Sequence, residues 1–276
     1  GSKYIDEKFK EDLESILDSY SRLGYRDSRI LADSVSWNED NTINIDITLE
    51  EGKQYIFGDI LYVGNKSYTD QQLNTLLKIQ KGDVYNGAVL KERITGDGSP
   101  TSEDIQTLYQ NSGFLFSSVN AVETKVLNDS ITVEIRIRED EKATINKVSV
   151  VGNDKTNDYV IYRELRVKPG SLFSRDAIIR SIREIGQLGF FDTNVTPDVK
   201  PNYQDKTADI EFSVTEKGGS QIELQGGYGG GSFIGTLGLS FNNFSIRNLF
   251  NKEAYKPLPM GDGQSLSLRL QTSRTF

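Results

Sequence analysis

The stretch that decides the fold is VGNDKTNDYVIYRELRVKPGSLFSRDAIIRSIREIGQLGFFDTNV, residues 151–195. A turn pair, Gly152-Asn153, follows a strand pattern and precedes a short apolar helix pattern that Pro169-Gly170 ends. From Ser174 onward, apolar residues recur at steps of three and four, which predicts a second helix with one buried face: Ile178, Ile182, Ile185 and Leu188. Strand patterns follow at residues 191–201 and 207–217. The predicted order is β-α-α-β-β, with two helices on a three-stranded sheet.

The same phrase recurs along the chain. A glycine-aromatic pair ends a helix pattern three times, at steps of 89 and 76 residues: Gly24-Tyr25, Gly113-Phe114 and Gly189-Phe190. A near-constant period of this size indicates one domain repeated in tandem. We therefore predict an α+β fold with a partial repeat over residues 1–52, complete repeats over 53–141 and 142–217, and a different tail over 218–276. The first repeat lacks the opening strand, so the chain is expected to begin inside a repeat.

The middle repeat carries extra residues within its long helix. The helix is expected to begin near Asn86 and to stop at residues 96–100, because two glycines and a proline cannot continue it. Thr101, with Asp104 three residues later, resembles a capping box, which predicts that the helix restarts there. We interpret residues 96–100 as an insertion at the surface.

Composition excludes several kinds of function. Hydrophobic residues make up 36% of the chain and charged residues 26%, which is typical of a globular protein. The chain has no cysteine and no histidine, so it has no thiol nucleophile, disulfide, imidazole base or Cys/His metal site. The net charge of −8, without a basic stripe, argues against binding to nucleic acid.

No motif typical of an enzyme or a cofactor site is present. GGYGGG (226–231) is not followed by the Gly-Lys-Ser/Thr of a phosphate loop and is better interpreted as a curved strand. Asp97 and Asp262 lie beside glycines and suggest calcium, but the carboxylate spacing of a helix-loop-helix site is missing. No serine lies in a nucleophile-elbow pattern. We predict no enzymatic activity, no cofactor and no metal site.

The tail alternates between apolar and polar residues. In QSLSLRLQTS (264–273), three leucines at every second position face one side, and serine, arginine and glutamine face the other. This alternation fits a membrane barrel strand, and it fits a half-buried soluble sheet equally well. A barrel needs at least about eight strands and the tail offers about three, so we hypothesise that it is a truncated barrel start with unpaired edges. Its expected first strand carries Ile222, Leu224 and Tyr228.

A three-stranded sheet leaves two edges to which an extended peptide can add as a further strand. The strands that follow the glycine-aromatic pairs are expected near an edge: residues 34–37, 117–125 and 193–200. We hypothesise that client strands add at Val119, Ala121 and Glu123, and at Thr193 and Val195. The competing interpretation is that charge and strand twist prevent any peptide from pairing with this edge, so that it binds no client.

The repeats resemble POTRA domains. The resemblance rests on short phrases in tandem order: Gly152-Asn153, Arg163-Glu164, Pro169-Gly170, Leu188-Gly189-Phe190-Phe191 and the closing Val214, Glu216 and Lys217. The tail, with ELQGGYGGG and then FIGTLGLSFNNF, is similar to the first barrel strands of the BamA family. The repeats would correspond to the end of the third POTRA domain and to the fourth and fifth.

The resemblance implies an outer-membrane barrel with residues 1–217 in the periplasm. Such proteins bind unfolded outer-membrane proteins and promote their folding and insertion without nucleotide, with the first barrel strand as a template edge. Implied partners are periplasmic lipoprotein subunits and, for the full-length protein, outer-membrane lipid, and Arg163 and Glu164 match a docking position of the family. The sequence departs from the family pattern at residues 96–100 and 245–263. The alternatives are a two-partner secretion or related POTRA-barrel translocation protein, and a soluble peptide-binding repeat scaffold.

Overall fold

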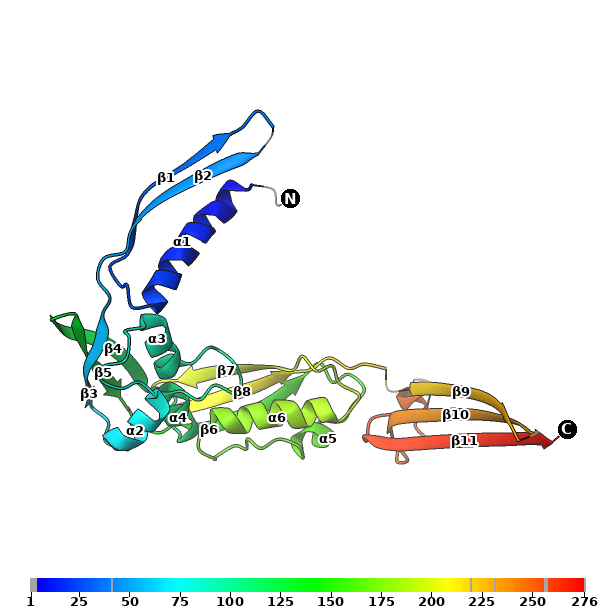
Figure 1. Cartoon of the computed structure of the whole chain (residues 1–276). Helices are drawn as coiled ribbons and strands as arrows, with labels where there is room; N and C mark the ends of the chain where they lie inside the picture. The colour runs from blue at the N-terminus through cyan, green and yellow to red at the C-terminus, as the bar shows by residue number, and fades with distance from the viewer. Residues whose placement is uncertain (1–3, 41, 219, 231, 256–257, 276) are drawn as a thin grey trace. The chain divides into compact units, whose positions relative to one another are not determined.

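The structure is a computed structural model that describes residues 4–40, 42–218, 220–230, 232–255 and 258–275. The chain forms two compact units (Figure 1). The first unit consists of Gly1–Gln110 and Phe116–Glu141, and the second of Asn111–Leu115 and Lys142–Phe276. Gly231, the last residue of GGYGGG, lies outside the described residues.

The first unit opens with one helix beside one hairpin. Helix α1 (Asp6–Arg22) precedes strands β1 (Arg29–Trp37) and β2 (Ile43–Glu50), which pair antiparallel. Acidic residues in the first turn of α1 and Arg22 in its last turn complement the helix dipole. Phe9 is the buried residue of α1, because two strands offer the helix little surface to cover.

The middle repeat has the predicted α+β architecture. Its elements are β3 (Ile56–Val63), α2 (Asp70–Leu77), α3 (Gly87–Thr95), α4 (Ile105–Asn111), β4 (Ser118–Leu127) and β5 (Ser130–Arg138). The sheet order is β3-β5-β4, with β5 parallel to β3 and antiparallel to β4. Apolar side chains from β5 and the helices form a fully buried core: Leu73, Leu77, Ile105, Tyr109, Ile131, Val133 and Ile135.

The long helix is interrupted where the sequence predicts. Asn86 caps α3 by accepting a hydrogen bond from the Val89 N–H. The cap of α4 is Asp104 rather than Thr101, since an Asp104 oxygen accepts from the Thr107 N–H at 2.8 Å. Asp104 is 1% exposed, and the hydroxyl groups of Ser102 and Thr107 satisfy its other oxygen.

The third repeat repeats this topology. Its elements are β6 (Thr144–Val151), α5 (Asp158–Tyr162), α6 (Arg175–Gln187), β7 (Thr196–Asn202) and β8 (Thr207–Ser213), in the sheet order β6-β8-β7 (Figure 1). Ser174 caps α6 as predicted. Strand β7 begins five residues later than the predicted start at residue 191, because Phe191 and Val195 are buried in the core ahead of the strand.

One turn is built identically in both complete repeats. Gly64 and Gly152 follow the opening strands with φ values of +91° and +89°, which favour glycine. A Cβ atom on Gly64 would lie 2.0 Å from the carbonyl oxygen of Ile137, and one on Gly152 would lie 2.0 Å from that of Val214. Both positions therefore exclude any side chain.

A glutamate near the end of each complete repeat stabilises the same turn. The Glu139 carboxylate accepts hydrogen bonds from the main-chain N–H and the hydroxyl of Ser67, at 2.7 and 2.8 Å. Glu216 accepts from the N–H groups of Lys155 and Thr156 and from the Thr156 hydroxyl. In both complete repeats, a glutamate carboxylate thus joins the end of the central strand to this turn.

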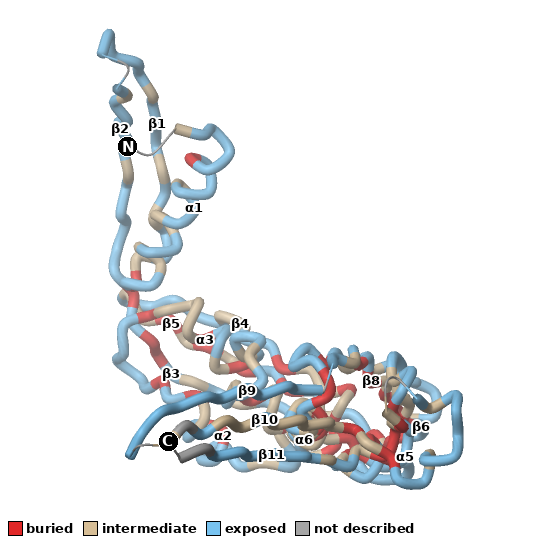
Figure 2. The backbone as a smooth tube through the Cα atoms, turned by 90° about the vertical axis from the view of Figure 1, so that its right-hand side faces the viewer, coloured by how far each residue is buried: buried red, intermediate tan, exposed pale blue. Residues whose placement is uncertain are grey.

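The tail is a separate sheet of three strands. Its strands are β9 (Ser220–Gly229), β10 (Ser232–Phe244) and β11 (Gln264–Thr275), in the order β11-β10-β9 and antiparallel throughout. The segment between β10 and β11 contains a short 3-10 helix, η1 (Lys252–Ala254). Figure 2 shows buried segments inside the repeats, whereas β9 and β11 are almost entirely exposed. Among the described helices, none is both long and apolar enough to span a membrane.

The turn predicts a matched pair of substitutions. Gly170 has a φ of +83° but an open surrounding, whereas Gly152 has both a positive φ and the contact with Val214. We expect Gly170→Ala to cost about 1–2 kcal/mol in the free energy of unfolding, from the left-handed backbone alone. Gly152→Ala should cost roughly 1–3 kcal/mol more, because its methyl group overlaps a carbonyl. Urea unfolding measures the difference, and equal losses would contradict the steric explanation.

The Glu139 contact predicts a pH dependence of stability. Burial alone would raise the pKa of Glu139, but hydrogen bonds from Ser67 and Tyr109 outweigh it and hold the pKa below the ordinary value of 4.5. The stabilisation is therefore complete above that value and is lost as the pH falls through the lowered pKa. Glu139→Gln should reduce the unfolding free energy by ~1–3 kcal/mol at pH 7 and should flatten its decline in acid. An unchanged acid profile in urea titrations would refute this role.

Candidate functional sites at the sheet edges

Strand β4 is an outer strand of the middle repeat. It pairs with β5 on one side, and no other described strand pairs with it on the opposite side. Its sequence, SVNAVETKVL, contains no proline, so each residue carries a main-chain N–H. An unpaired strand edge of this kind offers alternating donors and acceptors to an added strand.

The three predicted side chains on β4 have different surroundings. Val119 is 3% exposed and belongs to the core, whereas Ala121 is exposed. Glu123 accepts a hydrogen bond from the Tyr85 hydroxyl and forms an ion pair with Arg26, both at 2.5 Å. Burial, together with the bond to Glu123, raises the pKa of Tyr85, so the phenol stays protonated and donates at neutral pH. A strand added at this edge would therefore contact the main chain more than these side chains.

Strand β7 is the corresponding outer strand of the third repeat, and it differs in one respect. Its sequence, TPDVKPN, contains Pro197 and Pro201, each of which removes a main-chain donor. An edge strand accommodates proline when the proline nitrogen faces away from the neighbouring strand. The open side of the strand then lacks the N–H donor that an added strand would need. Thr193 and Val195 precede β7, and Val195 is 7% exposed, so neither lies on the strand edge as the sequence suggested.

Residues 34–37 form the end of β1, and among the described strands only β2 pairs with it. Because a sheet of two strands has no inner strand, β1 is an edge strand. Its last residue, Trp37, is 68% exposed.

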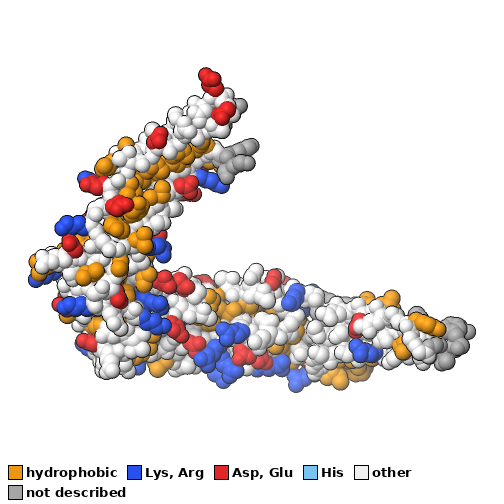
Figure 3. Space-filling model, viewed as in Figure 1, with side chains coloured by type: hydrophobic (Ala, Val, Ile, Leu, Met, Phe, Trp, Pro, Cys, Tyr) orange, Lys and Arg blue, Asp and Glu red, His pale blue; other side chains and the backbone are white. Residues whose placement is uncertain are grey.

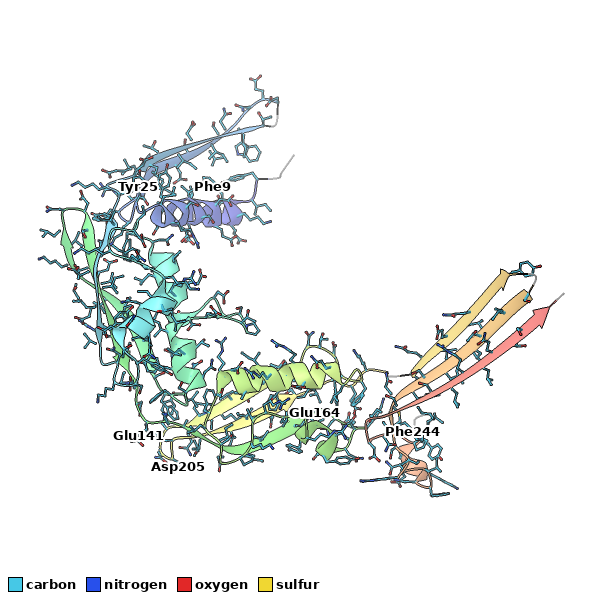
Figure 4. The ribbon with its side chains drawn as sticks, turned by 60° about the horizontal axis from the view of Figure 1, so that its bottom comes forward. Phe9, Tyr25, Glu141, Glu164, Asp205 and Phe244 are labelled. Atoms are coloured by element: carbon cyan, nitrogen blue, oxygen red, sulfur yellow. The ribbon has the colours of Figure 1, made fainter. Side chains whose placement is uncertain are left out.

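Arg163 and Glu164 follow α5 and contact each other. The Arg163 Nε lies 3.0 Å from Glu164 Oε1, and both side chains remain partly exposed (Figure 4). Arg163 also lies near the tail, since a Cβ on Gly263 would be 3.5 Å from its Nη2. The pair thus presents a surface carboxylate beside the segment that joins β10 and β11.

The two faces of the tail sheet have opposite chemistry. Cross-strand register aligns apolar side chains in two rows, Ile222–Leu239–Leu268 and Leu224–Leu237–Leu270. Ile222, Leu224 and Tyr228 are 76%, 82% and 72% exposed and share one face of the outer strand β9. On the other face, Glu223 and Arg269 form a 3.3 Å ion pair across Gly238. A Cβ on Gly238 would lie 3.1 Å from the Glu223 carboxylate, so glycine leaves room for the pair.

A buried polar network joins the tail to the third repeat. Asp262 is 6% exposed and accepts hydrogen bonds from Asn157, Tyr159 and Ser245, at 2.9, 2.6 and 2.8 Å. Burial alone would raise its pKa, but these bonds outweigh it and lower the pKa of Asp262. Nearby, Asn243 donates to the Thr156 hydroxyl. Sequence reasoning missed this network, and the Gly-Asp-Gly at 261–263 was its only local signal.

Among the residues that the structure describes, no group of three or more acidic side chains is placed to hold a metal ion. The Asp262 oxygens are occupied by the three donors above, and the Asp97 carboxylate accepts from the Ser99 N–H. The neighbouring glycines made both aspartates candidate calcium ligands, but their carboxylates accept hydrogen bonds that stabilise loops.

Comparison with known proteins identifies the family. The family model described as "POTRA: Surface antigen variable number repeat" matches residues 1–52, 55–140 and 143–217. The outer membrane protein assembly factor BamA of Neisseria meningitidis is 28% identical over 99% of this chain and 32% of its own length. BamA of Nitratidesulfovibrio vulgaris is 28% identical over 92% of this chain and 31% of its own length.

Solved structures agree on the fold. The crystal structure of Haemophilus influenzae BamA POTRA3-5 superposes with a TM-score of 0.60 at 23% identity, covering 78% of this chain and 83% of that one. The chain spans about a third of the length of the two BamA relatives, which are named as assembly factors rather than enzymes. The chain therefore belongs to the POTRA family; its three matched repeats are similar to the POTRA region of BamA-type outer membrane protein assembly factors and lie in the periplasm.

Proposed function

We propose that the middle repeat binds extended segments of unfolded outer-membrane proteins by strand addition along β4, and that this capture promotes their folding and insertion without enzymatic chemistry. The observation that carries the proposal is the unpaired, proline-free edge of β4, beside a third repeat whose β7 edge contains two prolines. Two repeats of one fold thus differ in the property that strand addition requires.

Main-chain pairing suits clients of varied sequence. Backbone hydrogen bonds supply affinity without regard to side chains, while alternate pockets add a weak preference. Val126 and Leu127, at the hairpin end of β4, are 47% and 56% exposed and offer apolar contact on opposite faces of the sheet. An amphipathic barrel strand, which alternates apolar and polar residues, has the pattern that such an edge accepts.

We propose further that β9–β11 is the beginning of a transmembrane barrel. The two apolar rows would face lipid, and the face with the Glu223–Arg269 ion pair would face water. Strand β9 has no described neighbour on its outer side, so it could serve as a template edge for a client strand.

The Arg163–Glu164 pair is our proposed docking point for a periplasmic lipoprotein subunit. Both side chains are partly exposed, and a basic side chain of a partner could replace Arg163 at the Glu164 carboxylate. This assignment relies on the family pattern together with the exposure of the pair.

Blocking the β4 edge should weaken peptide capture. Along an antiparallel pair, successive main-chain N–H groups point alternately toward the partner strand and away from it. We count this alternation from the hairpin turn at Asn128–Asp129 and allow for the one-residue register shift near Glu123. The Ala121 N–H then points away from β5, toward the open side of β4. Ala121→Pro should reduce affinity for a peptide of the β11 sequence, QSLSLRLQTS, by about fivefold to thirtyfold, since about 1–2 kcal/mol of hydrogen bonding is lost. Fluorescence anisotropy with the full chain measures the change.

Two controls separate binding from folding. Val199→Pro places a further proline on β7 and should leave peptide affinity unchanged, and Ala121→Ser should bind as the parent chain does. Hydrogen exchange on the unaltered chain should show added protection along β4, but not along β7, when the peptide is present. If the peptide protects neither strand, or if Val199→Pro weakens binding as much as Ala121→Pro, strand addition at β4 is wrong.

The two faces of the tail should respond oppositely to added charge. Leu224→Arg places a cation in an apolar row, whereas Gln225→Arg places the same cation on the polar face. We expect Leu224→Arg to reduce co-flotation with phospholipid vesicles at least about tenfold and Gln225→Arg to leave it nearly unchanged, because arginine on a lipid-facing position costs about 2–4 kcal/mol near the bilayer midplane. Equal effects of the two substitutions would refute the assignment of the faces.

A further inference from the structure

Residues 245–255, which we name the anchor loop, expose an unusual group of apolar side chains. Phe250 is 94% exposed, the highest value among the large hydrophobic residues that the structure describes. Ile246, Leu249 and Tyr255 are 64%, 43% and 42% exposed. Isolated exposed apolar residues are common, but four within one short loop are a candidate contact surface.

The loop holds these side chains on a well-bonded base. Ser245 is fully buried, donates to Asp262, and accepts from the Asn248 N–H at 3.1 Å. The Asn248 side chain donates to the carbonyl of Met260, and the Tyr255 hydroxyl donates to that of Leu249 at 2.6 Å. These hydrogen bonds hold the loop in a defined conformation, so Phe250 is exposed although the loop is folded.

Strand register places the anchor loop at a defined end of the tail sheet. Phe241 of β10 pairs with both Ser220, the first residue of β9, and Leu266, near the start of β11. The loop therefore follows Phe244 at the end where the chain enters the sheet from the third repeat (Figure 4). If the sheet lies in the membrane, this is its periplasmic end, where aromatic side chains gather at the headgroup level.

Charge favours lipid over a protein partner. The loop carries Arg247 and Lys252 against one carboxylate, Glu253, in a chain whose net charge is −8. Exposed apolar residues flanked by cations suit anionic headgroups. Four side chains are also far fewer than the roughly 20–30 residues that each partner contributes to a stable protein interface.

We propose that the anchor loop is an interfacial membrane anchor, in which Phe250, Ile246 and Leu249 enter the boundary between headgroups and acyl chains of the adjoining phospholipid leaflet, while Lys252 contacts anionic headgroups. This proposal rests on the proposed membrane placement of β9–β11. It extends lipid contact from the strands to a loop that also bonds to the third repeat through Asp262 (Figure 3 shows the apolar side chains at the tail surface). Movement of the repeat relative to the bilayer would thereby be restricted.

Tryptophan reporters test the anchor separately from the sheet. The chain has a single tryptophan, so Trp37→Phe gives a silent background for one reporter at a time. The reporters are Phe250→Trp in the loop, Leu224→Trp in the sheet, and Tyr203→Trp at an exposed position of the β7–β8 hairpin. Each variant of the whole 276-residue chain is mixed with vesicles of phosphatidylglycerol and brominated phosphatidylcholine, since bromine quenches only tryptophan that reaches the acyl chains.

The anchor predicts strong quenching at position 250 and none at position 203. In binding assays with the same lipids, Phe250→Ser should weaken vesicle association about tenfold, and Lys252→Glu about fivefold, with the latter effect lost on neutral vesicles. Quenching at position 224 without quenching at 250 would overturn the anchor and leave the barrel proposal intact. Quenching at 250 alone would support the anchor and refute membrane placement of the sheet.

Two further results would overturn the anchor. Quenching at neither position refutes both proposals, because no part of the tail would then reach lipid. A dimer in buffer that Phe250→Ser converts to a monomer, measured by light scattering, would assign the exposed loop to a second copy of the chain.

Discussion

The contact between a glycine turn and the end of a central strand determines each complete repeat. Gly64 and Gly152 approach the carbonyl oxygens of Ile137 and Val214 so closely that a Cβ atom would lie 2.0 Å away. Two residues later, Glu139 or Glu216 binds main-chain N–H groups of the same turn. These contacts fix the register of the parallel pair, so the remaining strand of each sheet must add on the far side. The open edges of β4 and β7 are consequences of this constraint.

The two complete repeats share one fold but differ in their outer strands. Strand β4 retains all its main-chain donors, whereas β7 loses two to proline. In the third repeat, Asn157 and Tyr159 at the start of α5 instead donate hydrogen bonds to Asp262 of the tail. The third repeat holds the tail, and another chain that paired with its β7 edge would compete with this attachment. Prolines in β7 prevent such pairing. The division favours capture of clients by the middle repeat and connection by the third.

Local signals in the sequence predicted much of this fold, and long-range contacts account for what was missed. The glycine-aromatic pairs, the helix starts near Asn86 and Ser174, and the alternation in the tail are each written in a few consecutive residues, so the sequence alone reveals them. Alternation gives the parity of a strand but not the face that is buried, so it did not indicate that Val119, which lies on the outer strand β4, has its side chain in the core. Val195 was predicted near an edge but is buried ahead of β7. Asp262 bonds to residues more than 100 positions away, and no local pattern could indicate that contact.

The tail sheet has an exposed apolar face and two unpaired edges, and one environment would account for both. Its apolar rows expose leucine and isoleucine side chains, each of which would gain about 1.5–3 kcal/mol from burial. Its polar face gains little in return, since an exposed ion pair such as Glu223–Arg269 contributes about 0–1 kcal/mol. Covering the apolar face with soluble protein would leave the edges of β9 and β11 unpaired, and pairing the edges alone would leave the apolar rows in water. A bilayer together with further strands would satisfy both requirements, because lipid would cover the face and closure of a barrel would remove the edges.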